Sequence, residues 1–158
     1  MKEFNITIPV KELRPDELTG ADRELASLAS EATYTSYSPY SHFAVGAAIL
    51  LDNGEIVTGS NQENAATPSS LCAERTAAYY AHARYPQARF VAIAIAARDT
   101  SGTPLEQPIS PCGACRQALL EFETIAGHNV RVILVGSSKC YIFSSVASTL
   151  PFCFSNFN

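Results

Sequence analysis

Three of the five cysteines in the 158-residue chain lie in two short segments that could together bind a metal ion. The segment PCGACRQ, residues 111–117, carries Cys112 and Cys115, and the segment LCAER carries Cys72. Side chains three positions apart on a helix share one face, so the sulfur atoms of Cys112 and Cys115 can reach a single ion. Each segment opens a helix-favouring run, and the free N–H groups and positive dipole end of a helix start stabilise a thiolate. These features indicate a metal site built from two helix starts.

Three thiolate ligands suit a catalytic zinc site better than a structural one. Structural zinc is held by four protein ligands, and neither Cys140 nor Cys153 has the spacing of a second ligand pair. Three protein ligands leave the fourth tetrahedral position to a water molecule. Glu74 follows Cys72 by two residues, so its carboxylate can reach such a molecule without binding the metal. The pattern therefore predicts a catalytic zinc site with Glu74 as its general acid and base.

The charge of such a site gives Arg75 an expected role. Three thiolates and one Zn²⁺ sum to about −1, and an electron-rich zinc ion activates water poorly. The two helix starts offset part of this negative charge. Arg75, directly after Glu74, is placed to donate hydrogen bonds to the sulfur atoms. We therefore expect Arg75 to support the site from outside the ligand set.

Hydrophobic periodicity predicts an α/β fold around these motifs. Asn53 and Gly54 separate two extended runs and predict a two-residue hairpin turn in which both residues have positive φ. Helices are predicted over residues 20–35, 72–84 and 112–125. Strands are predicted near residues 43–51, 55–60, 89–97, 130–136 and 141–143, with a last turn over 147–150. The sum is a sheet of about five strands covered by helices, in three layers around one core.

The composition favours one compact cytoplasmic domain over residues 1–158. A hydrophobic content of 47% fits a single core of this size. No apolar run approaches the roughly 18 residues that span a bilayer, and the first residues lack the apolar stretch of a signal peptide. The net charge is −4 and the 11 Lys and Arg residues are scattered, so we expect no binding to polymeric nucleic acid. An odd cysteine count in a reducing compartment favours a metal or catalytic role over disulfides.

Four segments together resemble the cytidine deaminases of the three-cysteine, homotetrameric class. They are YSPYSHFAVGAA at 37–48, GSNQENAA at 59–66, CAERTA at 72–77 and PCGACRQ at 111–117. The resemblance spans about residues 25–154. It implies a three-layer α/β/α cytidine-deaminase-like fold with a mixed sheet of about five strands. It also implies hydrolytic deamination of cytidine and deoxycytidine to uridine and deoxyuridine, in pyrimidine salvage. Thr67 and the long loop 98–110 depart from the family's usual pattern.

The resemblance also implies a role for each motif residue. One zinc ion per subunit would be held by Cys72, Cys112 and Cys115. Glu74 would move the proton, and Gln117 would support the site from outside the ligand set. The residues implied to contact the nucleoside are Phe43, Asn61, Glu63, Ala73 and Phe154. Among these, Ala73 would act through its backbone, and Phe154 would come from a neighbouring chain, so that the tetramer shares its active sites.

Residue types alone leave other roles open for several of these positions. The segment NQEN offers Asn61 and Glu63 to paired sugar hydroxyls, but a polar turn between a strand and a helix has the same composition. Phe43 begins an apolar strand and could equally be a core residue. Phe154 could bury its ring against the sheet of its own chain. Cys140 and Cys153 are expected to be buried thiols that behave as small hydrophobic side chains.

Three other functions compete with cytidine deamination at the level of sequence. A zinc-stabilised binding module would have four protein ligands and no role for Glu74. A deaminase of another aminopyrimidine nucleoside, such as blasticidin S, would lack the pair formed by Asn61 and Glu63. A polynucleotide-editing deaminase fits poorly with a net charge of −4. We therefore favour a deaminase of cytidine and deoxycytidine.

Overall fold

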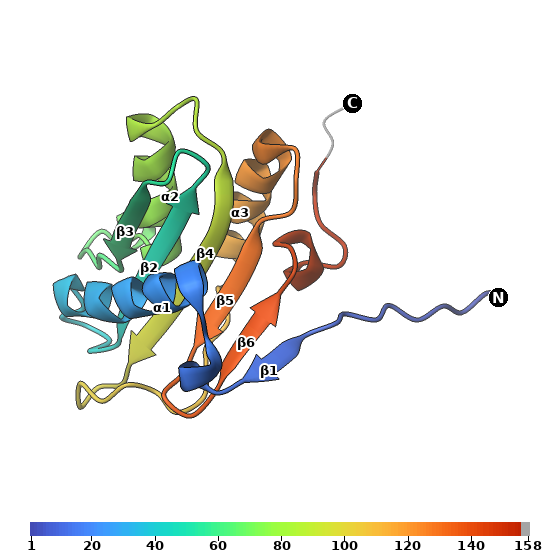
Figure 1. Ribbon diagram of the computed structural model, residues 1–158. Helices are drawn as coiled ribbons and strands as arrows, with labels where there is room; N and C mark the ends of the chain where they lie inside the picture. The colour runs from blue at the N-terminus through green and yellow to red at the C-terminus, as the bar shows by residue number, and fades with distance from the viewer. Residues whose placement is uncertain (156–158) are drawn as a thin grey trace.

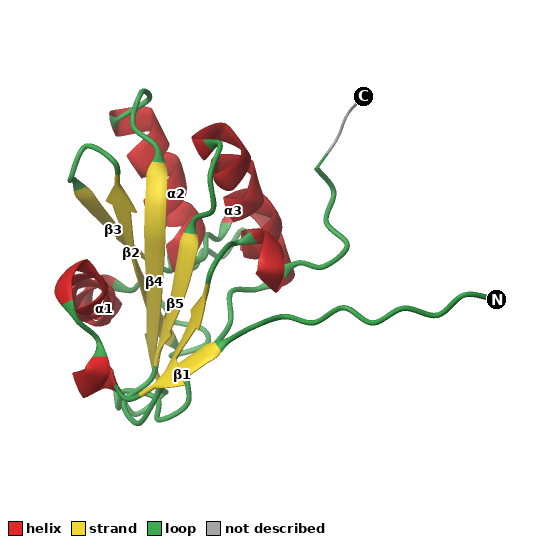
Figure 2. Ribbon diagram, turned by 45° about the vertical axis from the view of Figure 1, so that its right-hand side comes forward, coloured by secondary structure: helices red, strands yellow, loops and turns green. Residues whose placement is uncertain are grey.

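A single mixed sheet separates two layers of helices in the computed structural model, which describes residues 1–155 (Figures 1 and 2). The strand order is β1-β6-β5-β4-β2-β3; only β4 and β5 pair in parallel. The strands are β1 (Lys11–Leu13), β2 (Ala44–Leu51), β3 (Ile56–Ser60), β4 (Phe90–Arg98), β5 (Arg131–Val135) and β6 (Cys140–Phe143). The helices are α1 (Gly20–Ala32), α2 (Ala73–Arg84) and α3 (Gly113–Ala126). Short 3₁₀ turns cover Pro15–Glu17, Thr33–Thr35, Thr67–Ser69 and Ala147–Thr149.

The central strand β4 explains how the layers differ. Successive side chains of a strand point to opposite faces of the sheet. Ile93 and Ile95 pack in the core beneath α2 and α3, whereas the alanines that alternate with them face α1. Small side chains let α1 approach closely: a Cβ atom on Gly46 of β2 would lie 2.1 Å from the carbonyl oxygen of Ala29. The helices that begin at the cysteine motifs therefore lie side by side over the isoleucine face (Figure 2).

The predicted α/β architecture and its three layers are confirmed, but the sheet has six strands where about five were expected. The additional strand is β1, whose three residues, KEL, show no apolar alternation. It is defined by its antiparallel pairing with β6, in which Leu13 lies opposite Cys140. Pairing at a sheet edge is a tertiary contact that a three-residue pattern does not reveal.

The predicted hairpin turn between β2 and β3 was wrong in its detail. Gly54 has a φ of +85°, but among the described residues His42 is the one non-glycine residue with positive φ, so Asn53 does not adopt it. The N–H of Leu51 donates to the carbonyl of Glu55, and the N–H of Gly54 donates to the carbonyl of Leu51. The connection is thus a three-residue loop closed by a left-handed glycine, the next commonest hairpin solution. Within residues 1–155, no helix is long and apolar enough to cross a bilayer.

Candidate active site

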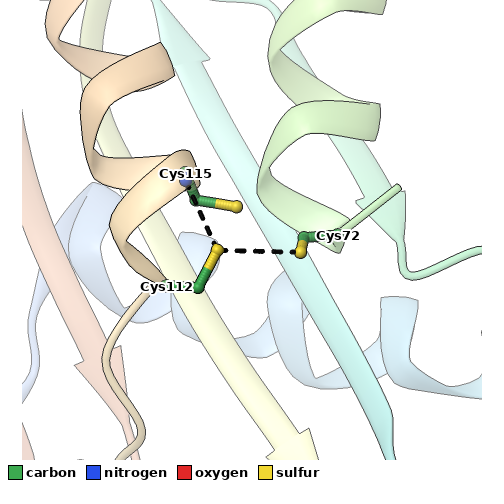
Figure 3. A group of neighbouring side chains, drawn as sticks. All are labelled: Cys72, Cys112 and Cys115. Carbon is green, nitrogen blue, oxygen red and sulfur yellow. Dashed lines mark hydrogen bonds between the residues drawn. The ribbon is translucent and has the colours of Figure 1, made fainter. Parts of the chain in front are cut away.

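Three thiols meet where α2 and α3 begin (Figure 3). Cys72 is the N-cap residue of α2, Cys112 is the N-cap residue of α3, and Cys115 lies in the first turn of α3. The sulfur atoms of Cys72 and Cys112 are 4.0 Å apart, and all three sulfur atoms lie within 4.8 Å of one another. The N–H of Cys115 donates to the sulfur of Cys112 over 3.4 Å. Free N–H groups at two helix starts therefore surround the cluster.

The thiol cluster fits a zinc ion in both chemistry and spacing. Thiolates are preferred zinc ligands, and sulfur atoms about 2.3 Å from a tetrahedral zinc ion lie roughly 3.8 Å from each other. A hydrogen bond from the Cys115 thiol, followed by one from Arg75, lowers the pKa of Cys72. The same thiol pair and burial raise the pKa of Cys115, so without a cation this thiol retains its proton. A divalent cation would compensate the negative charge that three thiolates accumulate here.

Arg75 lies against the thiol cluster. Its Nη2 donates to the sulfur of Cys72 over 3.6 Å. This hydrogen bond is the main reason that the pKa of Arg75 is raised above its usual value. Its Nε is buried and, within the described part of the chain, has no hydrogen-bond partner. Among the described residues, the Arg75 guanidinium forms no ion pair with a carboxylate, so its charge is available to the sulfur of Cys72.

Glu74 is a buried carboxyl group in the first turn of α2. Its residue is 4% exposed. Burial is the largest cause that raises its pKa, and the charge of the neighbouring Cys72 thiolate acts in the same direction. A carboxylate with a raised pKa takes up a proton more readily near neutral pH than an exposed glutamate does. Its place beside the thiol cluster suits proton transfer.

Asn61 connects three segments close to the end of β3. Its Oδ1 accepts hydrogen bonds from the hydroxyl of Ser36, 2.6 Å away, and from the N–H of Val45, 2.8 Å away. Its Nδ2 donates to the carbonyl of Phe43 over 2.9 Å. One amide hydrogen remains for a ligand, so Asn61 can donate to a sugar hydroxyl although its acceptor positions are filled. Phe43 is half-buried at the start of β2.

Glu63 presents a fixed carboxylate to a pocket of about 460 Å³. Its Oε2 accepts from the N–H of Tyr40 over 2.8 Å and more weakly from the N–H of Ser41, whose hydroxyl donates to Oε1. The hydroxyl bond of Ser41 and the N–H of Tyr40 lower the pKa of Glu63. The lining residues are Tyr40, Glu63, Asn64, Ala65, Thr67 and Ser70. Sequence analysis missed Tyr40 and Ser41, because no spacing rule connects residues 22 or more positions apart.

Gln117 of α3 contacts Phe154 of the carboxyl-terminal segment. The Nε2 of Gln117 donates to the carbonyl of Phe154 over 2.6 Å, and the N–H of Phe154 donates to Oε1 of Gln117 over 3.3 Å. The aromatic residue is 62% exposed. Ala73 is buried as the first residue of α2, so its N–H belongs to the unpaired first turn of that helix. The structure thus brings the cysteines, Glu74 and Arg75 together, whereas Gln117 binds the backbone of Phe154.

The chain is similar to cytidine deaminases over most of its length. The family model described as the cytidine and deoxycytidylate deaminase zinc-binding region matches residues 19–131. A cytidine deaminase from Sporosarcina psychrophila is 39% identical over 84% of this chain and 90% of its own. One from Halalkalibacterium halodurans is 45% identical over 63% of this chain and 71% of its own.

Solved structures show the same relationship. The crystal structure of cytidine deaminase from Burkholderia pseudomallei superposes with a TM-score of 0.69 and 34% identity, over 83% of this chain and 97% of that one. Cytidine deaminase from Mycobacterium tuberculosis superposes with a TM-score of 0.65 and 32% identity, over 84% of this chain and 96% of that one. The fold therefore has counterparts among solved cytidine deaminases.

Proposed function

The chain belongs to the cytidine and deoxycytidylate deaminase family, and from this premise we propose how its residues catalyse the hydrolysis of cytidine. The enzyme is a zinc-dependent hydrolase that converts cytidine and deoxycytidine to uridine and deoxyuridine with release of ammonia. The main support for this mechanism is that three thiols and the buried carboxyl group of Glu74 lie together where α2 and α3 begin.

Glu74 is the proton carrier of the reaction. Cys72, Cys112 and Cys115 would hold the zinc ion, which when bound would supply Lewis-acid activation of a water molecule. Glu74 accepts a proton from this water and donates it to N3 of the pyrimidine ring. A C4–O bond forms, and Glu74 then takes the remaining proton from that oxygen and passes it to the amino group, which leaves as ammonia when the C4–N bond breaks and the C4=O bond of the product forms. Burial raises the pKa of Glu74, which favours holding the proton between these steps.

The polar pocket beyond β3 binds the ribose. The remaining amide hydrogen of Asn61 donates to one hydroxyl, and the carboxylate of Glu63 accepts from the other. Hydrogen bonds from Ser41 and Tyr40 keep Glu63 ionised, which supports its role as an acceptor. Phe43 packs on one face of the base, and the backbone around Ala73 reads the pyrimidine edge.

A neighbouring chain completes the site in a homotetramer. A flat base needs cover on both faces, and Phe43 can cover one. The carboxyl-terminal segment offers a second ring, Phe154, which is 62% exposed on its own chain. In two views α3 lies between α2 and this segment, which supports delivery of Phe154 to a site other than its own (Figures 1 and 2).

The location and partners follow from the thiols and the charge. All five cysteines are free, which suits the reducing cytoplasm that thiolate ligands require. A net charge of −4 disfavours contact with polymeric nucleic acid, so the substrate is the free nucleoside. The 158 residues act as one deaminase domain.

An ultraviolet assay of cytidine loss tests the function directly. We expect turnover of cytidine and deoxycytidine that a chelator abolishes and added zinc restores. Blasticidin S, assayed in parallel, should remain unchanged, since the similar proteins described above are cytidine deaminases. Turnover of blasticidin S without turnover of cytidine would replace the proposal with the alternative deaminase.

A further inference from the structure

Gln117 holds the main chain of Phe154 as a neighbouring β-strand would. Its amide donates to the carbonyl of Phe154 over 2.6 Å and accepts from the N–H of the same residue over 3.3 Å. An amide side chain carries a donor and an acceptor side by side, as a peptide group does, whereas a carboxylate only accepts and an apolar chain does neither. The pairing joins residues 37 positions apart in the sequence. We call this pair of hydrogen bonds the clasp.

Two other side chains of α3 fix the turn that leads into the clasp. Arg116 donates from Nε to the carbonyl of Pro111 and from Nη1 to the carbonyl of Thr149, both over 2.9 Å. Glu123 accepts from the N–H groups of Val146 and Ala147 over 2.7 and 3.0 Å. The 3₁₀ turn and the clasped segment are therefore attached to α3 at successive points.

The clasp restrains the backbone of Phe154, and the residue as a whole remains largely exposed. Phe154 is 62% exposed and Phe152 is 85% exposed, whereas Cys153 between them packs against the core beneath α2 and α3. A ring that only filled its own core would be buried, so the exposed Phe154 contradicts the interpretation that it is a core residue of its own chain.

The clasp also faces away from the thiols of its own chain. A residue advances about 100° around an α-helix, so Gln117 lies roughly 200° from Cys115, on the far side of α3. The thiol cluster lies between α2 and α3, and the carboxyl-terminal segment lies on the opposite side of α3 (Figures 1 and 2). The backbone of Phe154, which Gln117 binds, therefore lies on the side of α3 opposite to the thiol cluster of its own chain.

We infer that Gln117 is a positioning residue for the active site of a second copy of this chain, because it fixes the backbone from which Phe154 reaches that site. The inference rests on the proposed function, in which Phe154 covers the base in a neighbouring subunit. One helix then serves two sites: the first turn of α3 carries Cys112 and Cys115 for its own chain, and the clasp orders an aromatic for the next chain.

A double-mutant cycle tests the clasp. Gln117→Met keeps the length of the side chain and removes both hydrogen bonds, and Gln117→Glu retains the acceptor alone. Loss of one hydrogen bond costs about 1 kcal/mol, which corresponds to a rate factor of about 5, so each variant should lower kcat/KM for cytidine about 5-fold or more. The loss should not exceed the loss in Phe154→Ala, because the clasp acts through that residue. Zinc content should not change. On the Phe154→Ala background, Gln117→Met should cause no further loss, because the clasp acts only through that ring.

The same cycle contains the results that would overturn the inference. Additive losses in the double variant, or loss of zinc in Gln117→Met, would mean that Gln117 acts on its own site or on the fold. Glu121→Gln is the matched control, since Glu121 is exposed one turn further along α3, and it should retain wild-type kcat/KM.

Mixed oligomers separate failure of the clasp from failure of the shared site. Gln117→Met chains reassembled with inactive Glu74→Gln chains should regain activity, because an intact clasp next door presents an intact Phe154. The double variant Glu74→Gln/Gln117→Met should give no such recovery. If Phe154→Ala chains recover beside Glu74→Gln chains while Gln117→Met chains do not, Gln117 does not position Phe154 for the neighbouring site, although the site is shared between chains. If neither recovers, the shared site itself is wrong and the inference fails with it.

Discussion

The sulfur atoms of Cys72 and Cys112 lie 4.0 Å apart although 40 positions separate the two residues in the chain. The contact exists because α2 and α3 run side by side over one face of the sheet and each begins with a cysteine as its N-cap residue. Two helix starts then direct their free N–H groups at the same cluster of thiolates.

Removing one thiol of this pair should abolish metal binding. Cys112→Ala leaves two ligands, too few for tetrahedral zinc, so metal analysis of the purified variant should find close to no zinc where the wild type holds one ion per chain. Cys153→Ser is the control, because Cys153 lies outside the cluster, and it should retain zinc. Full zinc content in Cys112→Ala would remove this residue from the ligand set.

Replacing Glu74 should separate metal binding from catalysis. Glu74→Gln keeps the shape of the side chain but cannot carry a proton, and loss of a general acid and base lowers rates by about 10²- to 10⁴-fold. We expect that loss in kcat with unchanged zinc content. Near-normal turnover in this variant would assign the proton transfers to another group.

Arg75 should matter through its hydrogen bond to the Cys72 sulfur. Loss of a partner that orients a metal ligand typically lowers metal affinity or activity about 10- to 100-fold, and we expect Arg75→Gln to fall in this range. A competition titration with a chromophoric chelator measures the affinity, and the cytidine assay measures the activity. Arg75→Lys keeps the charge but loses the forked geometry, so an intermediate result is expected. Wild-type values for Arg75→Gln in both assays would show that the helix starts alone offset the thiolate charge.

Glu63 should act on the sugar and not on the base. Glu63→Gln should raise KM for cytidine more than for 2′,3′-dideoxycytidine, which lacks the hydroxyls that the carboxylate accepts from. The hydrogen bonds from Ser41 and Tyr40 lower the pKa of Glu63 in the folded protein. The ionised carboxylate therefore stabilises the folded state at pH values above the pKa of an unfolded glutamate, and this stabilisation is lost as the pH falls through the lowered pKa. Equal effects on both nucleosides would place Glu63 outside the ribose site.

Glu123 should contribute to stability without touching the chemistry. Its buried carboxylate accepts from the N–H groups of Val130, Val146 and Ala147 over 2.8, 2.7 and 3.0 Å. In Glu123→Gln one acceptor oxygen becomes an NH₂ group that faces N–H donors, at a cost of about 1–3 kcal/mol. Thermal unfolding at fixed protein concentration should show a lower Tm, with zinc content retained. The exposed Glu121→Gln should leave Tm unchanged, and a wild-type Tm in Glu123→Gln would contradict the prediction.

Local sequence patterns were enough to predict most helices, most strands and the three cysteines that meet in the thiol cluster. An N-cap position needs only the few residues that follow it, so LCAER and PCGACRQ each identified a helix start. The apolar runs of β4 and β5 likewise predicted buried strands, because burial on both faces requires continuous apolar residues. The resemblance to cytidine deaminases, which rests on four segments between residues 37 and 117, is confirmed by the family match over residues 19–131.

Features that depend on contacts between distant segments were decided by the tertiary structure. The strand β1 exists because β6 offers it an edge, and the charge of Glu63 is held by Ser41 and Tyr40 from another loop. The resemblance implied that Gln117 supports the metal site, but in the structure its side chain binds the backbone of Phe154, 37 positions away. A local pattern specifies which residues begin a helix, whereas the packing of that helix on the sheet determines what each of its faces can reach.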